Sequence, residues 1–188
     1  IEGFAIFHHG YPKSKLIIVG GAPEDIRESQ QLAQRLKIPD DAFIFIGRQP
    51  HSGIPKYLKA FDVLAMTYPD EPHFARFMSP LKLFEYMAAH RPIVAADLPS
   101  LREILDETTA LFFIPDDPLS LAKKAQELLA DSGLGERLAT NAAQQRNHCT
   151  GVGDRHHLVL CAVKHPDRSV RNVFGSLRDS GTAENDSR

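Results

Sequence analysis

The segment Arg76–Ala89, RFMSPLKLFEYMAA, holds the residues whose types and spacing most clearly suggest chemistry. Ser79 is a favoured N-cap residue, and Pro80 suits the first helical position, where its missing N–H group costs nothing. The backbone N–H groups of Leu81 and Lys82 are then left without helical partners and point away from the helix end. A helix that begins in this way is a ready site for an anion.

Two charged side chains follow in that predicted helix. Lys82 lies in the first turn, where a cation opposes the helix dipole by about 0.3–1 kcal/mol, so its position makes sense if an anion such as a diphosphate binds there. Glu85 lies among apolar neighbours, and two ribose hydroxyls would satisfy its carboxylate. The alternative is a simple cap at Ser79 and Pro80 followed by an exposed Lys82–Glu85 pair worth about 0.2–0.5 kcal/mol.

These residues need a scaffold, and residues 1–145 provide the pattern of one. Short apolar runs alternate with amphipathic stretches, which predicts a parallel sheet covered by helices on both faces. The first helix would lack its preceding strand, so the chain is expected to begin within a βαβ unit. The expected strands are Lys15–Val19, Phe43–Ile46, Val63–Met66, Ile93–Ala96 and Leu111–Ile114. The expected helices are Glu2–His9, Glu24–Lys37, Ile54–Phe61, Ser79–His90, Leu119–Ala130 and Gly135–Gln145.

Ligands of open α/β sheets bind beyond the carboxyl ends of the strands. Gly20-Gly21 at that edge fits either a plain turn or a close approach of the backbone to a ligand. His73 is the histidine outside the tail to test there, with a bystander role as the alternative, and Ser100-x-x-Glu103 matches a capping box. The loops expected at the ligand edge are Gly20–Glu24, Gly47–Gly53, Thr67–Ser79 and Asp97–Ser100.

Composition excludes several classes of protein. The chain has 22 basic and 24 acidic residues, and its net charge of −2 gives no electrostatic reason to expect nucleic acid as a partner. No apolar run approaches the ~20 residues that cross a bilayer. Two cysteines are too few for a disulfide framework, so a reducing compartment is the default. We expect a cytoplasmic protein, with the inner membrane surface as an alternative location.

Residues 146–188 differ from the rest of the chain. Glycines and a proline interrupt any helical period, the end is polar, and Leu158–Val163 is the single short apolar run. We expect an irregular tail of which little packs, and the sharp change in composition suggests non-native sequence. The cysteines and histidines of the tail match no common zinc-finger spacing, so no metal site is expected.

The stretch SPLKLFEYMAAHRPIVAADLPSLREIL, residues 79–105, resembles the donor-site signature of GT-B glycosyltransferases, family 4 (glycosyl transferases group 1). The resemblance implies the C-terminal half of a GT-B fold, a Rossmann-like domain with a three-layer parallel sheet. Glu85 would hold the nucleotide ribose, Met78–Lys82 the diphosphate, and the loop after the second strand the nucleobase. The implied residues for the nucleotide sugar are Gly20, Gly21, Gly47, Arg48, Arg76, Met78, Ser79, Pro80, Leu81, Lys82 and Glu85.

The chain departs from the family in two ways. Family members often carry a second Glu eight residues before the ribose-binding one, and Phe77 stands at that place here, which leaves Arg76 and His73 as candidates for sugar recognition. Set against that family, the chain is also expected to lack the N-terminal acceptor half and the first strand of the C-terminal half. We therefore assign no catalytic residue, expect no turnover from the chain alone, and expect its exposed sheet edge to favour self-association.

The expected function follows from the resemblance. The chain would be the donor-binding half of an enzyme that moves a sugar from a nucleotide-diphosphate sugar to an acceptor, in glycan or polysaccharide biosynthesis, without a cofactor. The alternative is a non-catalytic Rossmann-like module that binds other proteins. Lys82 in the first helical turn favours the first function, and Phe77 favours the second.

Overall fold

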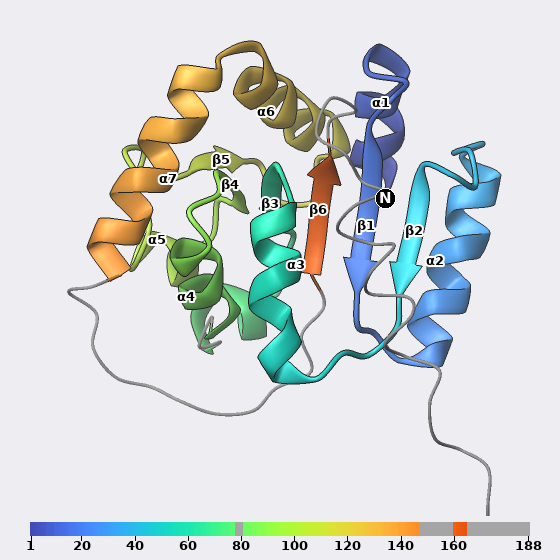
Figure 1. The fold of residues 1–188 in the computed structure, drawn as a ribbon, viewed down its shortest axis with the longest axis horizontal. Helices are drawn as coiled ribbons and strands as arrows, with labels where there is room; N and C mark the ends of the chain where they lie inside the picture. The colour runs from blue at the N-terminus through green and yellow to red at the C-terminus, as the bar shows by residue number, and fades with distance from the viewer. Residues whose placement is uncertain (78–80, 147–159, 165–188) are drawn as a thin grey trace, which may run out of the picture.

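The computed structural model describes residues 1–77, 81–146 and 160–164 of the 188-residue chain. It is an α/β fold built on one six-stranded sheet with the strand order β2-β1-β6-β3-β4-β5 (Figure 1). β1 pairs with β2, β3 with β4, and β4 with β5, all in parallel. The strands are β1 Lys15–Val19, β2 Phe43–Ile46, β3 Val63–Met66, β4 Ile93–Ala96, β5 Leu111–Phe113 and β6 Leu160–Lys164.

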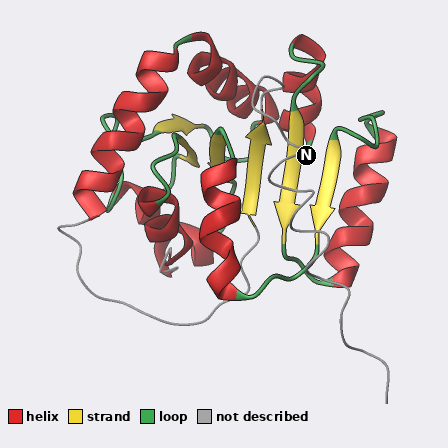
Figure 2. Ribbon diagram, in the orientation of Figure 1, coloured by secondary structure: helices red, strands yellow, loops and turns green. Residues whose placement is uncertain are grey.

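The helices lie around this sheet (Figure 2). Among them, α1 packs against α6, α4 against α7, and α6 against α7. The connections between parallel strands are thus made by helical crossovers, as the sequence predicts. The α-helices are α1 Glu2–Gly10, α2 Pro23–Arg35, α3 Ile54–Ala60, α4 Leu81–Ala88, α5 Pro99–Arg102, α6 Pro118–Ala130 and α7 Ser132–Arg146. Two short helical segments complete the described chain, the 3₁₀ turn η1 His51–Gly53 and the π-helical turn η2 His73–Phe77.

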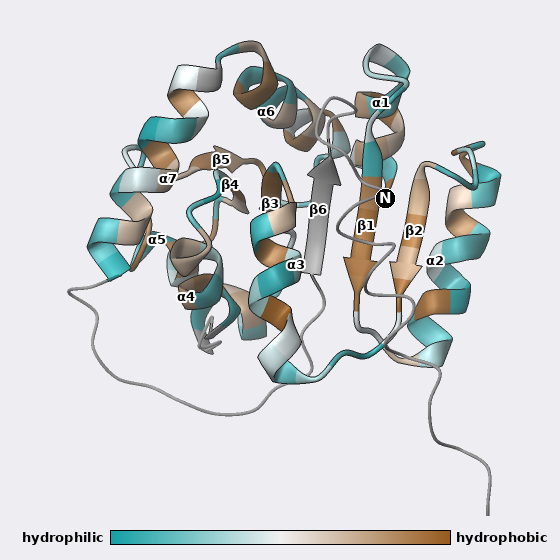
Figure 3. Cartoon of the chain, viewed as in Figure 1, coloured by the Kyte–Doolittle hydropathy of each residue, from teal (hydrophilic) through white to brown (hydrophobic). Residues whose placement is uncertain are grey.

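The core lies along the central strands. Every residue of β3 and β4 is buried, because helices cover both faces of a parallel sheet. The apolar colour of β1 and β2 against the mixed colour of the helices reflects the same division (Figure 3). The bulkiest fully buried side chains are Tyr86, Phe7 and Phe61. This packed centre fixes the carboxyl ends of the strands, where ligands of such sheets bind.

β6 departs from the expectation for the tail. Residues 146–188 were expected to be irregular, yet Leu160–Lys164 forms a strand that runs antiparallel between β1 and β3. The sheet is therefore mixed, with β6 as its antiparallel member. The physical reason is tertiary: β1 and β3 each present an unpaired edge of backbone N–H and C=O groups, and a short apolar run satisfies both. Residues 147–159 and 165–188 lie outside the described residues.

Smaller differences occur at the ends of elements. β5 ends at Phe113, and Ile114 is 64% exposed, one residue short of the expected strand. The capping box at Ser100 is wrong: Leu98 is the N-cap of α5, without a side-chain bond, because Pro99 takes the first helical position. Ser100 is buried and donates its hydroxyl to the carbonyl of Phe74 at 2.6 Å instead.

No helix in the described part of the chain combines the length and apolar character that crossing a bilayer requires.

Candidate functional site

The loop after β1 is a glycine turn. Gly20 and Gly21 adopt φ values of 96° and 99°, a region that residues with a Cβ rarely enter. Gly20 donates its N–H to the carbonyl of Ile46 at 2.9 Å, and a Cβ on Gly21 would lie 3.4 Å from Ile26 of α2. Backbone conformation alone therefore requires both glycines. Whether they also face a ligand stays a prediction.

Glu85 of α4 has the most distinctive environment of the predicted site residues. Its side chain is 27% exposed, and its Oε2 atom is buried with no hydrogen-bond partner among the described residues. Burial raises the pKa of this carboxyl group, while the charges of His51 and Lys82 act to lower it. A buried carboxylate oxygen without a partner is costly, so the position favours a ligand that donates hydroxyls.

His51 is a neighbour of Glu85 that the sequence analysis left among the loop residues. Its Nδ1 lies 3.6 Å from Glu85 Oε1, an ion-pair distance when the imidazole is protonated, although the His51 side chain is 85% exposed. The two residues are far apart in the sequence, so no local pattern signals their contact. The turn η1 thus brings the loop after β2 to the helix that carries Glu85.

The loop after β2 contains the predicted residues Gly47 and Arg48, both exposed. Gln49 fixes this loop: its amide donates to the carbonyl of Gly47 at 3.2 Å, and its side-chain oxygen accepts from the hydroxyl of the buried Tyr57 at 3.1 Å. A Cβ at Gly47 would meet nothing within 4 Å, so packing does not require a glycine there. The turn η1 begins at His51, three residues after Arg48, and the place of Gly47 and Arg48 beside a nucleobase stays a prediction.

Lys82 stands one turn before Glu85 on the same helix. Its charge reaches the Glu85 carboxylate closely enough to lower that pKa, so the two side chains share one electrostatic environment. The Lys82 Nζ atom lies 4.8 Å from the centroid of the Tyr68 ring, within the range of a cation–π contact. α4 is described from Leu81 onward, and its start at Met78, Ser79 and Pro80 lies outside the described residues.

Arg76 and His73, the candidates for sugar recognition, belong to the π-helical turn η2 before α4. Arg76 is exposed. The His73 ring meets the Phe74 ring edge to face, with centroids 5.2 Å apart. A π-helical turn is rare and occurs often at functional sites, so the segment deserves a test even though the sequence predicted only a loop there.

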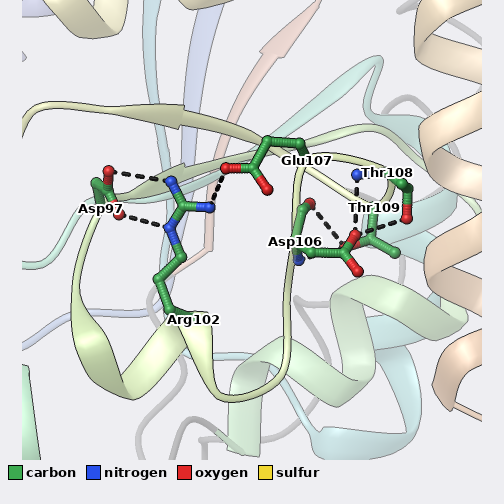
Figure 4. A network of polar contacts seen from close by, with 6 residues as sticks. All are labelled: Asp97, Arg102, Asp106, Glu107, Thr108 and Thr109. Atoms are coloured by element: carbon green, nitrogen blue, oxygen red, sulfur yellow. Dashed lines mark hydrogen bonds and ion pairs between the residues drawn. The ribbon is translucent and has the colours of Figure 1, made fainter.

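Asp97, in the loop after β4, is bound by a neighbouring side chain. The Arg102 guanidinium donates two hydrogen bonds to Asp97, of 2.6 and 3.0 Å, and a third to Glu107 (Figure 4). Its Cζ atom also lies 3.6 Å from the centroid of the Phe112 ring. The bond from Arg102 lowers the pKa of Asp97, and Asp97 in turn raises that of Arg102. Both side chains are committed to this contact and offer little to a ligand.

The turn formed by residues 106–109 adjoins these contacts in the sequence. Asp106 accepts the backbone N–H of Thr108 at 2.9 Å and its hydroxyl at 2.6 Å (Figure 4). These bonds from Thr108 are the main cause of the lowered pKa of Asp106. The side chains of Arg102 and Asp106 thus hold the segment from Asp97 to Thr109 together by local hydrogen bonds.

Comparisons with known proteins agree on one family. The family model described as "Glycosyl transferases group 1" matches residues 2–131. A protein of Bacillus subtilis (strain 168), whose name assigns it to teichuronic acid biosynthesis as the glycosyltransferase TuaH, is 25% identical over 111 residues. That match covers 59% of this chain and 27% of the relative, so the chain spans about a quarter of the length of that protein.

Solved structures share the fold. The sucrose-phosphate synthase of Thermosynechococcus elongatus superposes with a TM-score of 0.67 at 25% identity, over 78% of this chain and 37% of that one. The C-terminal domain of a group 1 glycosyl transferase, LpcC, from Francisella tularensis gives 0.65 at 24% identity, over 78% and 75% of the two chains. Anabaena HepE, solved with UDP and glucose, gives 0.59 at 19% identity, over 89% and 40%. The likeness to LpcC and HepE concerns the fold.

Proposed function

Because the chain belongs to the glycosyl transferases group 1 family, we propose that it is the sugar-donor half of a glycosyltransferase. Such an enzyme moves a sugar from a nucleotide-diphosphate sugar to an acceptor in the synthesis of a glycan or polysaccharide. The observation that carries the proposal is the pair formed by Glu85 and Lys82. One helix presents a half-buried carboxylate with an unpartnered oxygen and, one turn earlier, an ammonium group.

The two side chains bind different parts of the sugar donor. Glu85 accepts hydrogen bonds from the two ribose hydroxyls, which satisfies its buried Oε2 atom. Lys82 and the backbone N–H groups at the start of α4 bind the diphosphate and stabilise the charge that develops on it as the sugar departs. The loop of Gly47 and Arg48 lies beside the nucleobase.

The rest of the enzyme lies outside these residues in the proposal. The acceptor and any catalytic base belong to an N-terminal half of the same enzyme, so this chain alone binds nucleotide without turning it over. HepE, a structural neighbour, has been solved with UDP and with UDP-glucose, which makes UDP the first nucleotide to test here. The proposed location is the cytoplasm or the inner membrane surface, and the chain alone is proposed to self-associate.

Calorimetric titration of the chain with UDP and with GDP tests the proposal. We expect saturable binding of one of the two, and a loss of more than about tenfold in Glu85→Ala, because two charge-assisted hydrogen bonds of about 1.5–3 kcal/mol each are removed. Glu28→Ala is the matched control, since Glu28 is exposed on α2. Equal affinity in wild type and Glu85→Ala, or no binding of either nucleotide, would contradict the proposal.

A further inference from the structure

A series of contacts, defined by Ser100, Phe74 and Tyr68 and here called the column, leads to Lys82. The Lys82 Nζ atom lies 4.8 Å from the centroid of the Tyr68 ring. The Tyr68 ring stacks in turn on the Phe74 ring, with centroids 5.3 Å apart and planes inclined by 18°. The backbone of Phe74 is fixed by the hydroxyl of buried Ser100, which donates to its carbonyl at 2.6 Å. The column thus connects α5, the turn η2, the loop after β3 and the first turn of α4.

The geometry of this column suits a lysine whose ammonium group is held in position before an anion binds. An ammonium group in the first turn of a helix is disfavoured by the helix dipole, and a lysine side chain loses rotamer entropy when it is fixed. The negative face of an aromatic ring attracts the ammonium and offsets part of both costs. The ring adds no formal charge, so this contact does not neutralise the ammonium that would attract a phosphate.

We propose that Tyr68 is a positioning residue, whose aromatic face holds the Lys82 ammonium in place for the diphosphate of the sugar donor. The proposal rests on the proposed function for the identity of the ligand. The contact between the ring and the ammonium is independent of that function. Tyr68 works through its ring, because Nζ lies over that ring and the Phe74 ring stacks on it.

The test compares Tyr68→Phe, which keeps the ring, with Tyr68→Leu, which removes it. A proton held over an aromatic face resonates upfield, so the side-chain methylene shifts of Lys82, read by NMR, report the contact directly. We expect upfield shifts in wild type and Tyr68→Phe and their loss in Tyr68→Leu. We also expect UDP to bind about two- to fivefold more weakly to Tyr68→Leu, the range that an exposed cation–π contact of ~0.5–1 kcal/mol gives.

A double-mutant cycle separates positioning from general packing. In a Lys82→Ala background, Tyr68→Leu is expected to cause no further loss of UDP affinity, because the ring then has no ammonium to position. Phe74→Leu, which withdraws the support of the Tyr68 ring without altering Tyr68, is expected to reduce the Lys82 shifts and the affinity in the same direction. It serves as the second variant if Tyr68→Leu fails to fold.

Three results would overturn the proposal: unchanged Lys82 shifts in Tyr68→Leu, an equal loss of affinity in Tyr68→Phe, or an undiminished loss in the Lys82→Ala background. A failure of the proposed function has a different signature. In that case the wild-type chain would bind no nucleotide, while the Lys82 shifts would still depend on the ring of Tyr68.

Discussion

At the scale of single residues, Glu85 lowers the stability of the fold at a position that the proposed function uses for binding. Its Oε2 atom is buried without a partner among the described residues, and burial raises the pKa of the group. An ionised carboxylate in that position destabilises the folded chain, yet the proposed function requires the ionised form, which would accept two ribose hydroxyls. Binding sites often carry such local costs, and substitutions that remove them stabilise the fold.

Glu85→Gln is expected to stabilise the protein at neutral pH and to weaken nucleotide binding. A carboxyl group whose pKa is raised in the folded state stays protonated to a higher pH in the folded chain than in the unfolded chain. The wild type therefore loses stability as the pH rises from the ordinary value of 4.5 through the raised pKa. The Gln amide does not ionise, so Glu85→Gln does not lose stability in this pH interval.

Thermal melts from pH 4 to pH 8 with UDP titrations check this expectation. The melting temperature of Glu85→Gln should exceed that of the wild type at pH 7 and approach it near pH 4. In a domain of this size, each kcal/mol of unfolding free energy shifts the melting temperature by about 2–4 °C. Glu28→Gln, on the exposed surface of α2, is the control. A wild type whose stability rises through that interval relative to Glu85→Gln would contradict the stated sign.

The sequence singles out Lys82 and Glu85 but misses His51 and Tyr68. Both predicted residues lie in one helical turn, where spacing and the dipole rule apply directly. His51 contacts Glu85, and Tyr68 contacts Lys82, only because the loops after β2 and β3 converge on α4. Such contacts between distant segments follow from the packing of the whole fold, which no local pattern contains.

At the scale of elements, helix starts show how local bonds fix a boundary. Asp117 caps α6: its Oδ1 accepts the N–H of Leu119 at 2.9 Å and that of Ser120 at 3.0 Å. Pro118 takes the first helical position, so α6 begins one residue before the predicted Leu119. By contrast, α5 has no side-chain cap, because its start is set by Pro99 and by the contact of Ser100 with Phe74.

Asp117→Ala is expected to destabilise the fold by about 0.5–2 kcal/mol, since two backbone N–H groups of α6 lose their acceptor. Chemical denaturation with urea measures this change. Asp40→Ala is the control, because Asp40 is exposed in the loop before β2 and should stay within about 0.5 kcal/mol of wild type. Equal stability of the two variants would show that the cap contributes nothing.

The strands of residues 1–145 were predictable because each is a short apolar run closed by a turn. β6 was not. Most of its residues belong to the short apolar run Leu158–Val163, but glycines and a proline in the flanking sequence favour irregular structure over a strand. The free edges of β1 and β3 make it a strand, and those edges exist only once the rest of the sheet has formed.

At the scale of the whole molecule, β6 joins two parts of the sheet. Among the described strands, β1 pairs with β2 and β6, and β3 pairs with β4 and β6. The glycine turn after β1 and the loop of Tyr68 after β3 therefore keep their relative places through β6.

A disulfide trap tests the register of β6. Cys161 stands opposite Ile18, and residues directly opposite in an antiparallel pair have Cα atoms about 4.5–5.5 Å apart, within the range of a disulfide. We expect Ile18→Cys to form an intramolecular bond with Cys161 on mild oxidation, seen as faster migration on a non-reducing gel.

The control for the trap is Ile17→Cys, which points to the opposite face of the sheet and should form no bond. Cys149→Ser in both variants removes the other cysteine. A disulfide-linked dimer would show that a second copy supplies the strand, which is how the proposed self-association would arise. No bond in either variant would contradict the placement of β6.

The position of β6 has a consequence for synthesis of the protein on the ribosome. Residues 160–164 are synthesised after the other described strands, so β1 and β3 lack the strand that pairs with both of them until β6 has emerged. Closure of the sheet is then a late event that joins segments distant in the sequence, the kind of step that slows folding. Chains truncated before residue 160 would carry two open strand edges, which favour aggregation and binding by chaperones.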